Sequence, residues 1–136
     1  MSATKLLTTY VKLYISGPGW INEINLGATT IWERWNSVLP GGKMNSDGMN
    51  SLNHYSYGSI LGWMYRYIGG IKAVEPGFKK VIIRPIFDER IKYSKLRYNS
   101  AMGEYQIYWK YVNDNRVNIT VKIPFLCQAK VILPKK

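Results

Sequence analysis

The chain has 136 residues, of which 46% are hydrophobic and 14% aromatic, so it does not have the composition of a disordered protein and should form one ordinary domain or two small ones. Its single cysteine, Cys127, excludes an internal disulfide and any metal site that is built from several cysteines. A formal net charge of +11 raises the question of a polyanionic partner such as nucleic acid.

The positive charges are spread along the chain rather than clustered. They alternate with other side chains in the way that the solvated face of a sheet does, so no specific nucleic-acid partner is expected. No run of about 18 apolar residues occurs and the first residues lack the apolar core of a signal peptide, which predicts a cytoplasmic protein without a membrane partner. The spread residues are Lys92, Lys95, Arg97, Lys110, Arg116, Lys122 and Lys130.

In chain order, the first expected element is a helix. Apolar residues recur every three or four positions across residues 4–14, which is the pattern of one buried helical face. Gly17, Pro18 and Gly19 should end it, since neither residue type continues a helix cheaply. Residues 20–26 (WINEINL) then alternate apolar and polar side chains and predict a short extended segment.

A loop and a second helix follow. Residues 40–48 are rich in Gly, Asn, Ser and Asp, which is turn chemistry with little to order it. A helix should begin near Ser51 or Asn53, either of which can cap it, and end at Gly69 and Gly70. The buried side of this helix is expected to consist of Tyr57, Ile60, Leu61, Met64, Tyr65 and Ile68.

The second half of the chain predicts strands. From residue 78 to residue 134 the apolar period drops to two, as in a half-buried sheet. Turns at residues 102–103 and 113–115 should make antiparallel hairpins of about five strands. The fold class is therefore α+β, with a boundary near residues 73–77. One alternating row, expected to be buried, consists of Tyr105, Ile107, Trp109 and Tyr111.

The candidate site residues lie in the first half. Glu33 stands between Trp32 and Trp35, and the only histidine, His54, follows after the loop. Tryptophan faces can stack on sugar rings while a carboxylate activates water or holds hydroxyl groups, so this group suggests a sugar site. The structural alternative is that Glu33 is a solvated surface charge or pairs with its neighbour Arg34, and that the indoles are half-buried parts of the core.

Two further side chains also have structural readings. A lone histidine is commonly structural, although His54, in or just before the first helical turn, should have a neutral ring that donates one hydrogen bond and accepts another. Asp47 could be a second carboxylate of the site, but an Asp before a Gly is ordinarily a turn former.

A longer set of motifs resembles the carboxy-terminal part of bacterial α-L-rhamnosidases, glycoside hydrolase family 78. The motifs occur in the order and spacing of that family. They are GATTIWERW at residues 27–35, NSVLPG at 36–41, MNSLNHY at 49–55, Gly58, WMYR at 63–66, PGF at 76–78 and IIRP at 82–85.

The resemblance implies a division of the chain. Residues 1–75 would be the last helices of an (α/α)6 catalytic barrel with its active-site loop, and residues 76–136 would be a carboxy-terminal antiparallel β-sandwich-type domain. The remaining barrel helices would precede this sequence in a complete enzyme.

The resemblance also implies a catalytic mechanism and the residues that take part in it. The family hydrolyses terminal α-L-rhamnose by inversion with two carboxyl groups. Glu33 matches the general base, His54 matches a histidine that hydrogen-bonds rhamnose, and Trp32 and Trp35 would border the pocket. The family's general acid lies in an upstream motif that no part of this chain matches, so the isolated chain is expected to be inactive. No cofactor or metal is implied.

The expected partners follow from this reading. They are rhamnose-containing glycosides or polysaccharides, the upstream part of the enzyme, and a second copy of the chain held through exposed apolar helix surface. Two other functions remain open. A noncatalytic carbohydrate-binding or interaction module would need exposed, coplanar aromatic side chains on the sheet, and a nucleic-acid module would need clustered charge.

Overall fold

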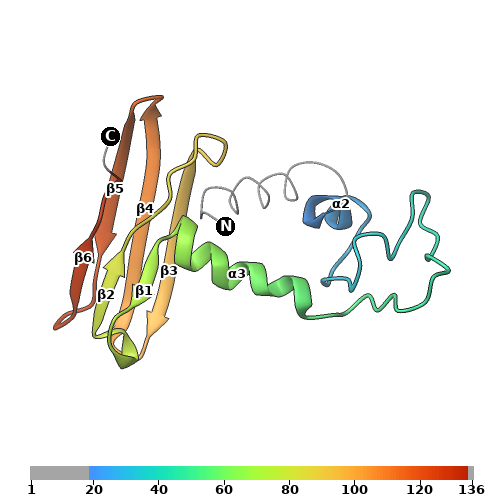
Figure 1. Cartoon of the computed structure of the whole chain (residues 1–136), viewed down its shortest axis with the longest axis horizontal. Coiled ribbons are helices and arrows are strands. Elements are labelled where there is room, and N and C mark those ends of the chain that lie inside the picture. Colours follow the sequence, from blue (N-terminus) through green and yellow to red (C-terminus); the bar gives the residue numbers. More distant parts are fainter. Residues whose placement is uncertain (1–18, 135–136) are drawn as a thin grey trace. The chain divides into compact units, whose positions relative to one another are not determined.

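The computed structural model describes residues 19–134, and the chain divides into two compact units, Met1–Ile60 and Leu61–Lys136 (Figure 1). The helix predicted for residues 4–14 lies outside the described residues. The predicted domain boundary at residues 75 and 76 stays a prediction. The two units are described separately below.

The first described element is a helix, α2 (Trp20–Asn25), so the prediction of an extended segment at residues 20–26 is wrong. The Gly19 carbonyl accepts the Glu23 N–H at 3.0 Å, and the Asn22 carbonyl accepts the Leu26 N–H at 3.0 Å. The alternating apolar and polar pattern does not predict the buried positions here, because the buried residue of this helix is Glu23, whereas Ile24 is 61% exposed. Polarity therefore did not report which side chains point inward.

The loop at residues 40–48 is more ordered than its composition predicted. Val38 and Met44 form an isolated antiparallel bridge. Within it the Leu39 N–H donates to the Lys43 carbonyl at 2.8 Å, and the Asn45 N–H donates to the Ser37 carbonyl at 2.9 Å. The turn residues thus close a small hairpin.

The helical segment in the middle of the chain begins later than predicted. It consists of a 3₁₀ turn η1 (Ser56–Ser59), α3 (Ile60–Trp63) and a π-helical turn η2 (Met64–Ile68). It does not begin at Ser51 or Asn53, because the backbone of residues 51–54 is paired with residues 31–33 instead. Ile68 is buried as expected, but the predicted buried side is wrong for Leu61 and Tyr65, which are 59% and 37% exposed.

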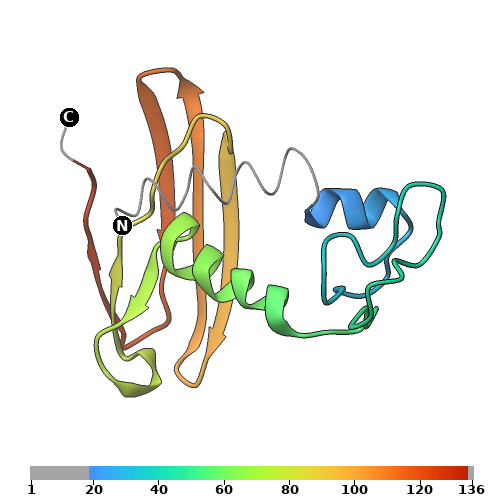
Figure 2. The same cartoon turned by 45° about the vertical axis from the view of Figure 1, so that its right-hand side comes forward.

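The second unit, Leu61–Lys136, is called the β unit below, and it contains two three-stranded sheets (Figures 1 and 2). One sheet has the order β1-β2-β6, and in it β6 runs parallel to β2 rather than antiparallel as predicted. The other is fully antiparallel in the order β3-β4-β5. The strand bounds are β1 (Ile71–Ala73), β2 (Lys80–Ile83), β3 (Tyr93–Ser100), β4 (Gly103–Asn113), β5 (Arg116–Lys122) and β6 (Gln128–Val131), and a 3₁₀ turn, η3 (Pro76–Phe78), lies between β1 and β2.

Both predicted hairpin turns are confirmed. Ser100 pairs with Gly103 across the turn between β3 and β4, and Asn113 pairs with Arg116 across the turn between β4 and β5. The seven spread lysines and arginines named above are all exposed. They therefore add charge to the surface of the sheets, as the alternating pattern indicated.

The core of the β unit lies between the two layers. Tyr105, Ile107 and Trp109 have no exposed surface, which confirms the buried row on β4, although Tyr111 is only half-buried. The Trp109 Nε1–H donates to the Ile68 carbonyl at 2.8 Å, and the Tyr105 hydroxyl donates to the Phe78 carbonyl. Because these rings are enclosed and their polar atoms are bonded within the chain, this row offers no platform for a sugar. The cluster between the sheets consists of Ile71, Val81, Ile83, Leu96, Tyr105 and Ile107.

Within residues 19–134, no helix is both long and apolar enough to cross a membrane.

Gly70, between the helical segment and β1, allows a stability prediction. Its φ is +79°, and a Cβ built there would lie 2.2 Å from the backbone nitrogen of Pro85. Gly77 is the matched control because its φ is +71° but a Cβ there would meet nothing within 4 Å. Both alanine variants should lose about 1–2 kcal/mol to the left-handed backbone, and Gly70→Ala should lose a further ~1–3 kcal/mol to overpacking.

Urea titration followed through the Trp109 indole N–H resonance measures this difference, because that proton is bonded inside the same unit. Equal unfolding free energies for Gly70→Ala and Gly77→Ala would contradict the close approach of Pro85.

Candidate active site

Glu33 and His54 lie on two backbone segments that are hydrogen-bonded to each other. The Glu33 N–H donates to the Ser51 carbonyl at 2.9 Å, and the His54 N–H donates to the Ile31 carbonyl at 2.7 Å. The Thr30 hydroxyl donates to the Leu52 carbonyl beside them. The loop between the two segments therefore doubles back and brings the two candidate residues into one local structure.

The Glu33 carboxylate is held by a backbone donor. Its Oε2 accepts the Ser51 N–H at 3.0 Å, so Ser51 bonds both the main chain and the side chain of Glu33. The side chain is half-buried. In the part of the chain that the structure describes, no lysine or arginine forms an ion pair with it.

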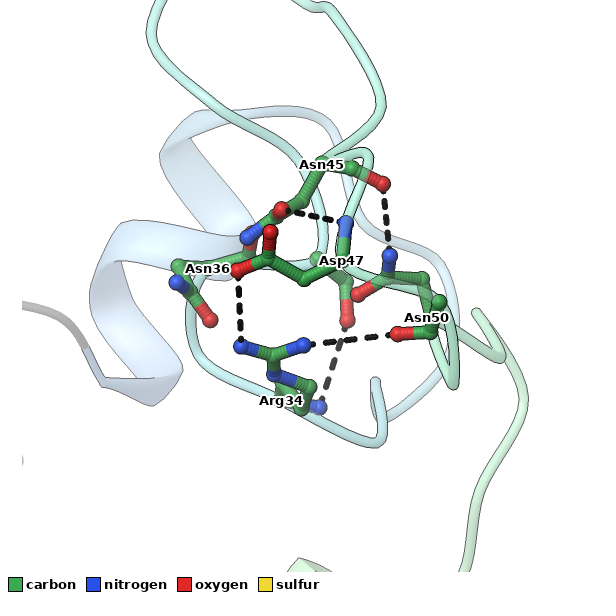
Figure 3. Close-up of polar contacts among 7 residues, drawn as sticks. Arg34, Asn36, Asn45, Asp47 and Asn50 are labelled. Atoms are coloured by element: carbon green, nitrogen blue, oxygen red, sulfur yellow. Dashed lines mark hydrogen bonds and ion pairs between the residues drawn. The ribbon is translucent and has the colours of Figure 1, made fainter.

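Arg34 is engaged elsewhere, so the structural reading in which it pairs with Glu33 is wrong. Its Nη2 lies 3.6 Å from Asp47 Oδ2, and its Nη1 donates to the Gly48 carbonyl at 3.3 Å (Figure 3). The guanidinium thus ties the far end of the loop to the Glu33 segment. Asp47 has the turn role that its sequence context indicated, since its N–H also donates to Asn45 Oδ1 at 3.0 Å.

Asparagine side chains complete the ordering of the loop (Figure 3). Asn45 Nδ2 donates to the Asn36 carbonyl at 3.1 Å, and Asn50 Nδ2 donates to the Asn45 carbonyl at 2.6 Å. The amides that suggested an unordered loop therefore supply the bonds that order it, which sequence composition could not reveal.

His54 lies just before η1, as predicted. Its Nδ1 accepts the Ser56 N–H at 3.3 Å, and its ring stacks on Tyr55 with centroids 5.1 Å apart. A ring that accepts at Nδ1 carries its proton on Nε2 when it is neutral. The remaining nitrogen is thus a hydrogen-bond donor.

The candidate pocket indoles have different surroundings. Trp32 is only 4% exposed and belongs to the first unit, Met1–Ile60, called the amino-terminal unit below. Trp35 stacks on Tyr57 with centroids 3.9 Å apart, and Trp20 meets it edge-on at 4.7 Å. The sequence does not reveal Trp20 and Tyr57 as partners of Trp35, because its alternating pattern predicts a short extended segment at Trp20. A pocket-wall role for Trp32 and Trp35 stays a prediction.

Glu23 is a buried acid that sequence reasoning did not single out. The residue is 2% exposed, and its Oε1 has no hydrogen-bond partner. Burial raises the pKa of the Glu23 carboxyl above its ordinary value of 4.5, and a hydrogen bond from the Trp32 backbone N–H partly offsets this. Burial thus disfavours the charged form of this carboxyl relative to the unfolded chain.

A groove of about 810 Å³ lies in the β unit, away from these residues in sequence. Its polar lining includes Tyr65, Arg66, Lys72 and Tyr98. In the described part of the chain its lining includes no carboxylate and neither Glu33 nor His54, so it is separate from the two candidate residues. Among residues 19–134, no group of three or more His, Cys, Asp and Glu side chains could hold a metal ion.

The raised pKa of Glu23 predicts how stability depends on pH. A folded-state pKa above the unfolded value of 4.5 means that the contribution of the group is complete below about pH 4.5 and is lost as pH rises through the folded pKa. Glu23→Gln should remove that loss. Its unfolding free energy relative to the parent chain, measured by urea titration at intervals between pH 4 and pH 7, should therefore rise with pH.

Glu75→Gln is the control, because Glu75 is an acid of the other unit whose side chain is 40% exposed and whose Oε1 lies 2.6 Å from Lys80 Nζ. It should gain no stability over the same interval. A pH-independent difference for Glu23→Gln would show that the Glu23 carboxyl ionises normally in the folded chain.

Two family models cover almost the whole sequence. The bacterial alpha-L-rhamnosidase 6 hairpin glycosidase domain matches residues 10–68. The bacterial alpha-L-rhamnosidase C-terminal domain matches residues 70–136. The order of helical and β parts agrees with the α+β class expected from the sequence.

Curated relatives of this chain are also named α-L-rhamnosidases. The α-L-rhamnosidase of Alteromonas sp. (strain LOR) is 40% identical over 117 residues, which are 86% of this chain and 13% of that protein. The α-L-rhamnosidase of Formosa agariphila is 39% identical over 117 residues, which are 86% of this chain and 12% of that protein. The chain thus spans about an eighth of the length of these relatives.

Solved structures of α-L-rhamnosidases are similar to this chain. The native α-L-rhamnosidase from Aspergillus terreus matches with a TM-score of 0.81 and 30% identity, over 89% of this chain and 14% of that one. The Streptomyces avermitilis α-L-rhamnosidase complexed with L-rhamnose matches with a TM-score of 0.74 and 34% identity, over 85% of this chain and 11% of that one. With both domain models matched in order, this chain belongs to the bacterial α-L-rhamnosidase family.

Proposed function

We propose that this chain supplies the general-base part of an α-L-rhamnosidase active site, which removes terminal α-L-rhamnose from glycosides or polysaccharides with inversion. The observation that carries the proposal is the Glu33 carboxylate, which is oriented by the Ser51 N–H at 3.0 Å and has no ion-pair partner in residues 19–134. Family membership and the names of the relatives support the substrate.

The environment of Glu33 suits a base. A carboxylate paired with a guanidinium has its oxygens occupied by N–H donors and is less free to bind and deprotonate a water molecule. Arg34 is instead turned to Asp47 and Gly48, so its charge is partly balanced away from Glu33. A single neutral N–H donor orients the Glu33 carboxylate and leaves lone pairs for a water molecule.

His54 suits a positioning role in the same site. With Nδ1 accepting the Ser56 N–H, its Nε2–H can donate to a sugar hydroxyl. The backbone bond from His54 to Ile31 keeps it on the segment next to Glu33. The side chains of Glu33 and His54 would then face one solvent-open concavity, bordered by Trp32 or Trp35.

The second carboxyl group of an inverting site must lie roughly 6.5–9.5 Å from the first, and it acts as the general acid. On this proposal it belongs to a part of the catalytic barrel that is not in this sequence. The upstream part of an α-L-rhamnosidase is therefore the proposed partner.

A chimera tests the role of Glu33. In the Streptomyces avermitilis relative, this chain would replace the segment that it matches, and hydrolysis of an aryl α-L-rhamnoside would be followed. Glu33→Gln should lower kcat by about 10²–10⁴ because proton removal from water is lost. The KM should change little because the side chain keeps its size. His54→Ala should instead raise KM.

Glu75→Gln, a substitution in the other unit, is the matched control and should leave the rate unchanged. The isolated chain should not hydrolyse the same substrate. Full activity of the Glu33→Gln chimera, or turnover by the isolated chain that Glu33→Gln abolishes, would refute the proposed division of roles.

We also propose that the isolated chain self-associates through the helical segment. Leu61 and Tyr65 are 59% and 37% exposed there, and exposed apolar side chains favour association in water. Sedimentation velocity should show dimers or larger species whose fraction rises with concentration. Leu61→Lys should shift the chain toward monomer, and a parent chain that sediments as a monomer at every concentration would refute this.

A further inference from the structure

The groove of about 810 Å³ in the β unit is formed by three parts of that unit. The helical segment supplies one part of the lining and β1 supplies another, and aromatic side chains from η3 and β3 complete it. Every lining residue belongs to the β unit, so the groove is a feature of that unit alone. Its aromatic rings are those of Tyr65, Tyr67, Phe78 and Tyr98.

The aromatic rings in the groove contact one another. The centroid of the Tyr98 ring lies 4.4 Å from that of Phe78 and 6.0 Å from that of Tyr65, which it meets edge-on. The Tyr65 hydroxyl donates to the Arg97 carbonyl at 3.2 Å, which ties the helical segment to β3. Aromatic walls of this kind are typical of pockets for small ligands, and walls that are fixed in advance lower the entropy cost of binding.

The charged side chains in the described lining of the groove are both cationic. They are Arg66 in η2 and Lys72 in β1, both exposed, and within residues 19–134 neither takes part in an ion pair. The Lys72 Nζ lies 4.8 Å from the centroid of the Tyr67 ring, so a cation–π contact holds the ammonium at the wall. Glu75, the acid nearest in sequence, lies 2.6 Å from Lys80 instead.

Two unpaired cations beside aromatic rings indicate the chemistry of a ligand. A carboxylate can accept two parallel N–H bonds from the planar Arg66 guanidinium and a further bond from the Lys72 ammonium. A sugar ring that carries this carboxylate can pack on the aromatic walls, and its hydroxyl groups can bond to the tyrosine hydroxyls. Because the chain belongs to a family of glycosidases, we expect ring and carboxylate together in a uronic acid unit of a glycan.

We propose that the groove binds an acidic sugar, a uronic acid unit of a glycan, with its carboxylate on Arg66 and Lys72 and its ring against the aromatic walls. This inference goes beyond the proposed function, since neither Glu33 nor His54 lines the groove. The groove would make acidic glycans better ligands of this chain than neutral ones, whatever the chemistry at Glu33.

The test uses saturation-transfer difference NMR, which observes the sugar and needs only dilute chain. Dilution is required because Tyr65 also belongs to the surface proposed for self-association. Trigalacturonic acid is the probe, and its methyl ester, which has the same rings without the charges, is the control ligand. The acid should bind about tenfold more tightly than the ester because its hydrogen bonds are charge-assisted, and added salt should reduce this difference.

Variants of the chain locate the binding. Arg66→Gln should weaken binding of the acid about tenfold and binding of the ester much less, because only the acid bonds through its charge. Lys72→Gln should act in the same direction. Arg116→Gln is the matched control, since Arg116 is an exposed arginine on β5 outside the groove and its loss removes the same charge. Glu33→Gln should leave this binding unchanged, so the groove is tested separately from the proposed function.

Three results would overturn the proposal: no binding of the acid, equal affinities for the acid and its ester, or equal losses in Arg66→Gln and Arg116→Gln. The Trp109 indole N–H resonance shows that each variant is folded. A triglutamate peptide with blocked ends has the same number of carboxylates without sugar rings, and it should bind about fivefold more weakly or less. Peptide binding as tight as that of trigalacturonic acid would identify a surface for acidic peptides instead.

Discussion

The pairing of residues 31–33 with residues 51–54 is the constraint on which the amino-terminal unit depends. It consists of two backbone bonds and the bond from the Ser51 N–H to Glu33 Oε2. Residues 51–54 are bonded to this segment, and the helical segment begins after them, at Ser56. The same bonds place the only histidine of the sequence on the segment that pairs with the Glu33 segment.

The charged groups near this pairing have different partners, and the Glu33 carboxylate is not held in an ion pair within residues 19–134. Arg34, the adjacent cation, is bonded to Asp47 and Gly48 at the end of the loop. An exposed pair of this kind contributes little to stability, about 0–1 kcal/mol. Its consequence here is geometric: the loop is closed, and Glu33 has a backbone donor in place of a cation.

The β unit is stabilised in a different way. Its two layers enclose aromatic rings whose polar atoms are bonded to the backbone: Trp109 to Ile68 and Tyr105 to Phe78. Burial of these rings supplies apolar stabilisation, and the bonds remove the cost of enclosing their polar atoms. They also tie β4 to the end of the helical segment and to η3. The enclosed rings exclude this row as a sugar-binding platform.

The sequence by itself determined the α+β class, the two hairpin turns and the buried row on β4, because a period of two and Gly or Asn at turns depend on local geometry. It also identified the family through motifs, and with it Glu33 and His54 as candidates. Only the tertiary structure decided that residues 20–25 are helical with Glu23 inward, that β6 pairs in parallel with β2, and that the loop is ordered. The β6–β2 pairing and the order of the loop depend on partners distant in sequence, such as Lys80 for Gln128 or Asp47 for Arg34, and no local pattern records such a partner.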